Sequence, residues 1–189
     1  VQSTAMLDKV GISVEETAEN IGVMSAAMGM SEAAAAKTQT AMFLFAQENN
    51  IASKQMFSDF QQNRGMLMRF GADAVDVFQG LAIAAKQSNM EVSQLISISE
   101  QFDRFDTAAE SVGRLNALLG GPFLNTLEMV TSTDPLERLQ MLQEGLINAG
   151  KGFDDMSYYE RQAIADAMGL KDVGELALVM GGNFDGLAK

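Results

Sequence analysis

Apolar residues recur along this chain at intervals of three and four, the spacing that places side chains on one face of an α-helix. The clearest stripe consists of Leu136, Leu139, Leu142 and Leu146. No clean alternation of apolar and polar residues, as expected for a half-buried strand, is bounded by turns. The pattern therefore predicts an all-α protein. Further helical segments are expected over residues 33–45, 56–70 and 75–85.

Two helix starts are marked by capping residues. Asp134 precedes Pro135, a residue suited to the first helical position, and Glu137 follows three residues after Asp134. Ser157 and Glu160 have the same spacing ahead of an apolar run. A Ser, Thr or Asp followed three residues later by Glu is typical of a capping box, in which two side chains satisfy each other's backbone N–H groups. We expect a capping box at both positions.

A short turn motif recurs between the predicted helices. Gly or Asn is followed by Met, Ile or Leu and then by a residue that opens the next helix. Gly and Asn tolerate the left-handed conformation that ends a helix, and the apolar residue folds back onto the last turn. Ser13 and Ser31 are expected to cap the helices that follow. The motif occurs at residues 11–13, 29–31, 50–52, 89–91 and 169–171.

These irregularly spaced turns predict a compact irregular bundle of short helices joined by Gly/Asn-capped turns. Gly120-Gly121-Pro122 must end another helix, because proline cannot continue one. Gly145, Gly150 and Gly152 are expected to mark a loose stretch. The expected organisation is an Ala/Met-rich helical segment at 1–80, a second helical domain at 81–182, and a linker into further sequence at 183–189.

Composition narrows the possible chemistry. The 189 residues include no His and no Cys, which excludes disulfides, zinc sites built from those ligands, and imidazole or thiolate catalysis within this chain. The net charge of -12 disfavours direct binding to nucleic acid or to an anionic membrane. No apolar run is long enough to predict a membrane segment. Because the sequence begins at Val1 without a leader, we expect a piece of a longer polypeptide.

Carboxylates are the remaining candidates for catalysis. Asp103 and Asp106 lie three residues apart, with Arg104 between them and Phe102 and Phe105 beside them. On one helix face such a pair can act in acid–base chemistry or bind a metal. The alternative is a solvated acidic face with the two phenylalanines turned inward. The sequence favours the second interpretation, so we expect no enzyme activity and no cofactor.

Fourteen methionines allow two interpretations. Flexible thioethers suit adaptable binding surfaces, and they also fill irregular gaps in a core. Met24, Met28 and Met30 form one cluster, and Met66 and Met68 form another. Core filling is the expected role, and such cores rearrange at low cost.

Residues 81–182 resemble a region of tape measure and related large structural proteins of bacteriophage tails. The resemblance depends on short blocks, of which Gly-Gly-Pro and Ser-Tyr-Tyr-Glu-Arg are the most specific. Residues 1–80 are similar only in style, as Ala-rich helices broken by short turns. The blocks are Glu100-Gln101-Phe102-Asp103-Arg104-Phe105-Asp106, Leu115-Asn116-Ala117-Leu118-Leu119-Gly120-Gly121-Pro122, Thr133-Asp134-Pro135-Leu136-Glu137-Arg138, Met156-Ser157-Tyr158-Tyr159-Glu160-Arg161 and Ala167-Met168-Gly169-Leu170.

The resemblance implies a non-enzymatic role in tail assembly, tail-length determination and genome delivery. It implies location in the phage tail after assembly in the host cytoplasm. The implied partners are further copies of the chain, as a homo-oligomer, and other tail or baseplate proteins. The frequent helix breakers depart from a long rod and suggest a globular segment near one end of a tape measure. The residues expected to contact a partner are Phe102, Phe105, Pro122, Phe123, Tyr158 and Tyr159.

Two other functions remain open from the sequence. The chain can be an acidic helical adaptor or regulatory domain that binds a basic partner. It can also be an enzyme that uses carboxylates alone, in which case substitution of Asp103 or Asp106 would abolish a measurable activity.

Overall fold

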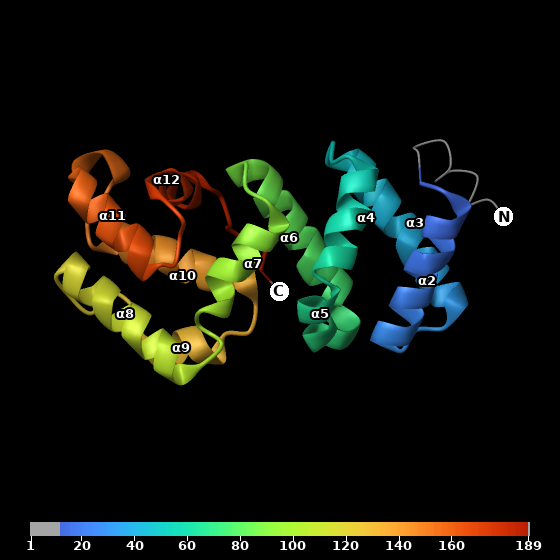
Figure 1. Ribbon diagram of the computed structural model, residues 1–189, viewed down its shortest axis with the longest axis horizontal. Coiled ribbons are helices and arrows are strands. Elements are labelled where there is room, and N and C mark those ends of the chain that lie inside the picture. Colours follow the sequence, from blue (N-terminus) through green and yellow to red (C-terminus); the bar gives the residue numbers. More distant parts are fainter. Residues whose placement is uncertain (1–11, 189) are drawn as a thin grey trace. The chain divides into compact units, whose positions relative to one another are not determined.

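Helices joined by turns make up the fold of residues 12–188, the part of the chain that this computed structural model describes, apart from the side chain of Ala27. No strand occurs among these residues, so the predicted all-α class is confirmed (Figure 1). None of their helices combines the length and apolar character needed to cross a bilayer.

The chain divides into two compact units, Val1–Ile83 and Ala84–Lys189. The division falls within helix α6, three residues beyond the expected boundary after residue 80. The helices described in the first unit are α2 (Val14–Met28), α3 (Glu32–Glu48), α4 (Ser53–Gln62), α5 (Arg64–Leu67), the 3-10 helix η1 (Met68–Asp73) and α6 (Ala74–Ser88). The last of these, α6, continues into the second unit.

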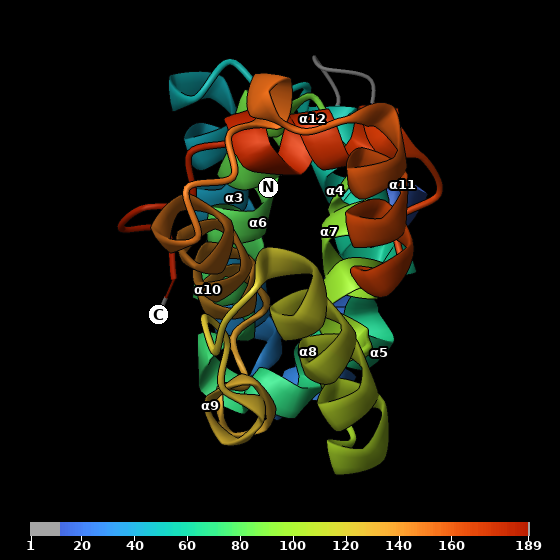
Figure 2. The ribbon, with the colours of Figure 1, turned by 90° about the vertical axis from the view of Figure 1, so that its left-hand side faces the viewer.

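In the second unit, α7 packs on α10, α8 packs on α9 and α11, and α12 packs on both α10 and α11. Figure 2 shows α10 and α11 on either side of α12. The helices of this unit are α7 (Val92–Glu100), α8 (Phe105–Leu119), α9 (Thr126–Thr131), α10 (Pro135–Asn148), the 3-10 helix η2 (Phe153–Asp155), α11 (Tyr158–Ala167) and α12 (Val173–Gly181).

The predicted turn motif is confirmed at four positions, and Gly11 of the fifth lies outside the described residues. Gly29, Asn50, Asn89 and Gly169 have φ values of 64°, 51°, 55° and 68°. After three of these turns, the backbone N–H of the next residue donates a hydrogen bond to the carbonyl oxygen five residues earlier, with N–O distances of 2.7, 3.0 and 2.9 Å. The bonds therefore have the geometry of a left-handed helix cap. They are Ile51 to Ala46, Met90 to Ala85 and Leu170 to Ala165.

The predicted helix starts are also present, with one correction. Ser157 and Glu160 form the expected capping box, and Ser13 and Ser31 each cap the next helix. Asp134 caps α10 by accepting a bond from the backbone N–H of Leu136 at 2.8 Å. The reciprocal capping box is not formed, because the Asp134 carboxylate bonds the N–H of Leu136 and not that of Glu137. The carboxylate of Glu137 accepts a hydrogen bond from the Ser132 hydroxyl.

Two expectations about helix breaks were wrong. Residues 56–70 do not form one helix, because α4 ends at Gln62. The next residue, Asn63, caps it, and its side-chain amide donates to the carbonyl of Asp59 at 2.7 Å and competes with the helical pattern. Gly145 is not in a loose stretch but is buried inside α10. A Cβ there would lie 2.7 Å from Cδ2 of Leu124, so the absence of a side chain permits this close packing.

Each unit has its own core. In the first unit the rings of Phe60 and Phe78 meet edge to face, with centroids 5.1 Å apart. The core-filling role holds for Met24 and Met66, which are buried, whereas Met68 is exposed. In the second unit the expected linker includes a core residue, because Phe184 is fully buried. The largest fully buried side chains overall are Phe60, Phe78, Phe102, Phe184, Met24, Met42, Met56, Leu67, Leu81, Leu95 and Leu115.

Candidate protein-binding surfaces

The predicted contact residues divide into core and surface. Phe102 was wrongly expected at a surface: it is fully buried, because it extends the inward stripe that begins at Val92 in α7. Phe105, the first residue of α8, is 62% exposed, since the buried stripe of that helix begins one turn later at Ala108. The expectation that both phenylalanines turn inward therefore fails for Phe105.

Tyr158 and Tyr159 form the most exposed aromatic pair in the described residues. The two residues are 66% and 82% exposed, so neither ring packs into the core. Their ring centroids lie 5.9 Å apart at an interplanar angle of 75°. Both belong to the first turn of α11, directly after the Ser157 cap. Exposed aromatic rings on a fixed helix provide contact area at a low entropic cost.

The helix turn that carries the two tyrosines is held in place by a charged side chain. The carboxylate of Glu160 accepts hydrogen bonds from the Lys151 ammonium at 2.8 Å and the Ser157 backbone N–H at 2.9 Å. These interactions, led by the one with Lys151, lower the pKa of Glu160 from its ordinary 4.5 to about 2. The first turn of α11 is thereby tied to the segment that precedes it.

Pro122 and Phe123 lie in the turn after α8. Pro122 is exposed and Phe123 is half-buried. The side chain of Asn116 closes this turn by bonding both backbone groups of Leu124, at 2.8 and 2.9 Å. A Cβ at Gly121 would lie 2.9 Å from the ring of Phe123, so a side chain there would require that ring to shift. The predicted contact residues Phe105, Pro122, Phe123, Tyr158 and Tyr159 thus have at least part of their side chains accessible, and their role stays a prediction.

The two candidate catalytic carboxylates do not share a helix face. Asp103 lies in the turn before α8 and accepts a bond from the Arg138 guanidinium at 2.6 Å. Asp106 lies within α8 and pairs with Arg104 at 2.9 Å. The Arg104 hydrogen bond is the largest cause of the lowered pKa of Asp106. No group of three or more potential metal-ligating side chains occurs between residues 12 and 188.

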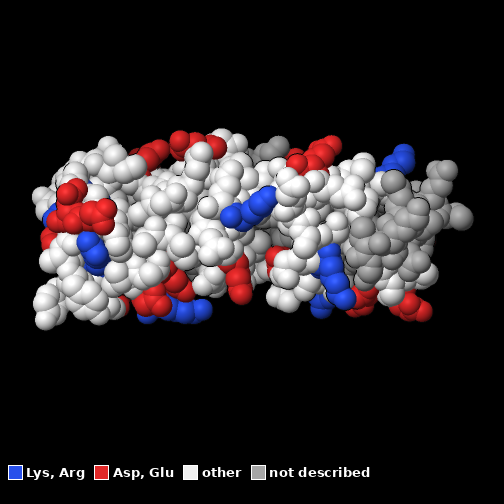
Figure 3. Space-filling model, turned by 90° about the horizontal axis from the view of Figure 1, so that it is seen from above, with Lys and Arg blue, Asp and Glu red and all other residues white. Residues whose placement is uncertain are grey.

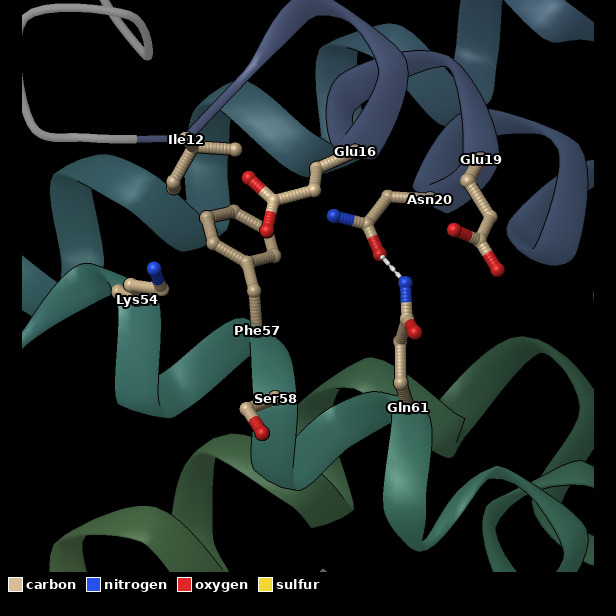
Figure 4. A pocket seen from close by; sticks show the side chains of 8 residues that line it. All are labelled: Ile12, Glu16, Glu19, Asn20, Lys54, Phe57, Ser58 and Gln61. Atoms are coloured by element: carbon tan, nitrogen blue, oxygen red, sulfur yellow. Dashed lines mark hydrogen bonds between the residues drawn. The ribbon is translucent and has the colours of Figure 1, made fainter.

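A polar pocket of about 220 Å³ lies between α2 and α4 in the first unit (Figure 4). Its inner side contains Phe57 and a hydrogen bond from the Gln61 amide to the Asn20 carbonyl oxygen. Glu16, at its edge, accepts a bond from the backbone N–H of Ser13 at 2.7 Å, which is the main cause of its lowered pKa. Glu19, Lys54 and Ser58 also line this pocket.

Sequence reasoning missed several exposed apolar residues. Leu127 is 62% exposed in α9, and Ile147 is 70% exposed at the end of α10. Ile147 does not belong to the apolar stripe that ends at Leu146, and this feature of the sequence could have predicted its exposure. Acidic side chains are dispersed among wider uncharged areas on the face shown in Figure 3, so the negative charge is not gathered into a single patch there.

Comparison with protein-family models, with curated proteins and with solved structures finds no match to this chain. The resemblance to phage tail proteins accordingly depends on the sequence blocks alone.

Proposed function

We propose that this chain is a non-enzymatic, protein-binding segment of a bacteriophage tail tape measure protein. The observation that carries the proposal is the Tyr158–Tyr159 pair, whose rings are 66% and 82% exposed. The pair belongs to the Ser157–Arg161 block, one of the most specific parts of the resemblance. A large exposed aromatic surface in the block that carries the resemblance supports an assembly contact at this point.

The experiment is a site-specific photocrosslink combined with an immunoblot of purified tails. Tyr159 is replaced by a photoreactive benzoylphenylalanine in the phage that encodes the chain, and Leu127, which is 62% exposed, receives the same replacement as a matched control. We expect a band far above 20.3 kDa in virions, with crosslinks to a tail protein or a further copy from position 159 and few from position 127.

A second candidate is an acidic adaptor that binds a basic partner, which is favoured by the excess of 25 acidic over 13 basic residues. In that case an antibody to the segment would detect a species that stays in the host cytoplasm and is missing from tails. That result would reject the tail assignment.

A further inference from the structure

An apolar hollow of about 540 Å³ opens where α10 and α12 end in the second unit. Its floor contains Ile147, Phe153, Ala177 and Met180. A second hollow of about 450 Å³ shares Ile147 and Met180 with the first, so the two adjoin. We call the two together the α10/α12 groove. Apart from Gly182, the other residues that line the second hollow are polar or acidic: Gln140, Gln143, Glu144, Asn183 and Asp185.

One wall of the α10/α12 groove is fixed by two glutamines of α10. The side-chain amide of Gln143 donates to the carbonyls of Val179 and Gly182, at 2.7 and 2.6 Å, and so fastens the end of α12. Gln140 donates to the carboxylate of Asp185 at 3.0 Å. These bonds fix the position of this wall, and a preorganised wall lowers the entropic cost of binding.

Another wall of the groove is formed by Phe153, which is held in place by Arg161 of α11. The guanidinium of Arg161 lies 4.2 Å from the centroid of the Phe153 ring, and its Nε donates to the Phe153 carbonyl at 2.8 Å. Lys151 is paired with Glu160 at 2.8 Å. The two basic residues near this wall are therefore already engaged with the protein itself.

The α10/α12 groove is electrostatically negative. Both helices end at it, and neither carries a basic residue in its last turn. The ammonium of Lys151, which also lines the groove, is paired with the carboxylate of Glu160, so it brings no net positive charge to the two helix C-termini. Exposed carboxylates add to this effect: Glu144 and Asp185 line the groove, and Asp154 and Asp155 follow Phe153 directly.

We propose that the α10/α12 groove binds a basic amphipathic helix of a partner protein. The apolar face of that helix would cover Ile147, Phe153 and Met180, and its flanking Lys or Arg side chains would face the helix ends and Glu144. An apolar floor with an acidic border matches this ligand in both shape and charge. A second copy fits less well, because each chain carries a net charge of -12 and would bring further negative charge to a negative groove. The inference does not depend on the tail assignment.

The test is titration of the full chain with a fluorescent model helix of leucine on one face and lysine on the other, followed by fluorescence anisotropy. Gly181→Phe fills the groove: a side chain at this position has open space and no backbone strain. Gly113→Phe in α8, where a Cβ also has open space, is its matched control. We expect Gly181→Phe to weaken binding at least about tenfold, as for the loss of a central contact, and Gly113→Phe to leave it unchanged.

Charge is tested in the same titration. Glu144→Lys should weaken binding severalfold, whereas Glu110→Lys, at an exposed position of α8, should change it little. A model helix with glutamate in place of lysine should not bind, and raising the salt from about 50 to about 500 mM should reduce affinity for the lysine helix.

Three results would overturn the inference. The first is that the lysine helix does not bind, or binds equally to wild type and Gly181→Phe. The second is that the glutamate helix binds as well as the lysine helix. The third is that the chain sediments as a dimer that Gly181→Phe dissociates, which would assign the groove to a second copy.

Discussion

Arg138 in α10 is 3% exposed and holds the carboxylate of Asp103, in the turn before α8, at 2.6 Å. The same guanidinium donates to the carbonyls of Ser99 and Met129, at 2.8 and 2.9 Å. One buried side chain therefore joins the end of α7, the turn before α8 and α9 to α10. Asp103, which the sequence pattern made a candidate for catalysis, therefore forms an ion pair with this buried arginine.

Arg138→Met should lower the free energy of unfolding by about 3 kcal/mol, because it removes the donor that two buried residues' carbonyls and the Asp103 carboxylate share. Urea unfolding followed by tyrosine fluorescence measures this, since both tyrosines of the chain lie in the second unit. Arg104→Met is the control, because the Arg104–Asp106 pair is 75% and 65% exposed. Equal losses from the two substitutions would contradict the assignment of Arg138 as a buried clamp.

Gln39→Met should stabilise the first unit. Gln39 is fully buried in α3, and neither its side-chain nitrogen nor its oxygen has a hydrogen-bond partner. An apolar side chain of similar size removes that desolvation cost, so the free energy of unfolding should rise by about 1–3 kcal/mol. Gln47→Met, at an exposed position of the same helix, should have little effect. Thermal unfolding followed by circular dichroism tests the pair, and a loss of stability in Gln39→Met would show that the amide is satisfied.

Two glycine-to-alanine substitutions should have opposite signs. Gly113→Ala in α8 meets no atom within 4 Å and should stabilise by up to about 1 kcal/mol through helix propensity. Gly145→Ala in α10 would place a Cβ 2.7 Å from Cδ2 of Leu124, and overpacking of this kind costs about 1–3 kcal/mol. Denaturant unfolding of both variants decides the question, and stabilisation by both would mean that Leu124 moves aside freely.

The pH dependence of stability should include a contribution from Glu160. Its pKa is lowered from 4.5 to about 2 in the folded protein, so the charged form favours folding. The contribution is fully present above the unfolded pKa and is lost as the pH falls from about 5 towards 2. Glu160→Gln does not titrate, so its stability deficit relative to wild type should shrink over that range. A deficit that stays constant with pH would contradict this, and Lys151→Met should weaken the same pH dependence.

The exposed and buried aromatic residues should respond differently to truncation. Tyr158→Ala with Tyr159→Ala should abolish the proposed crosslinking contact while leaving the unfolding midpoint of the chain nearly unchanged, since both rings lie largely in solvent. Phe102→Ala should instead destabilise by about 3–5 kcal/mol, as expected for a fully buried phenylalanine. Circular dichroism gives the stability, and pull-down with tail proteins gives the contact. A large stability loss in the tyrosine double variant would place those rings in the core.

Sequence reasoning succeeded where the structural cause is local. The caps at Gly29, Asn50, Asn89 and Gly169 depend on one residue's backbone preference and the next residue's apolar side chain. The Ser157 capping box likewise depends on residues three apart. Such interactions are completed within one turn of chain, so the pattern of residue types contains them.

It failed where partners are distant in sequence. Arg138 bonds Asp103, which lies 35 residues earlier in the sequence. The side chain packed against Gly145 belongs to Leu124, 21 residues earlier. Nothing beside Gly145 in the sequence distinguishes a glycine that loosens the chain from one that permits close packing. The α10/α12 groove was missed for the same reason, because it is assembled from the ends of two helices that are separated by α11.

The left-handed caps have a consequence for how quickly the chain folds. The bonds from Ile51 to Ala46, Met90 to Ala85 and Leu170 to Ala165 each span five residues, so each turn forms without waiting for distant segments to meet. Helical proteins with mainly local contacts fold in about microseconds to milliseconds. If the folded chain is extended and unfolded, each of these turns can form again independently, before the core of either unit is rebuilt.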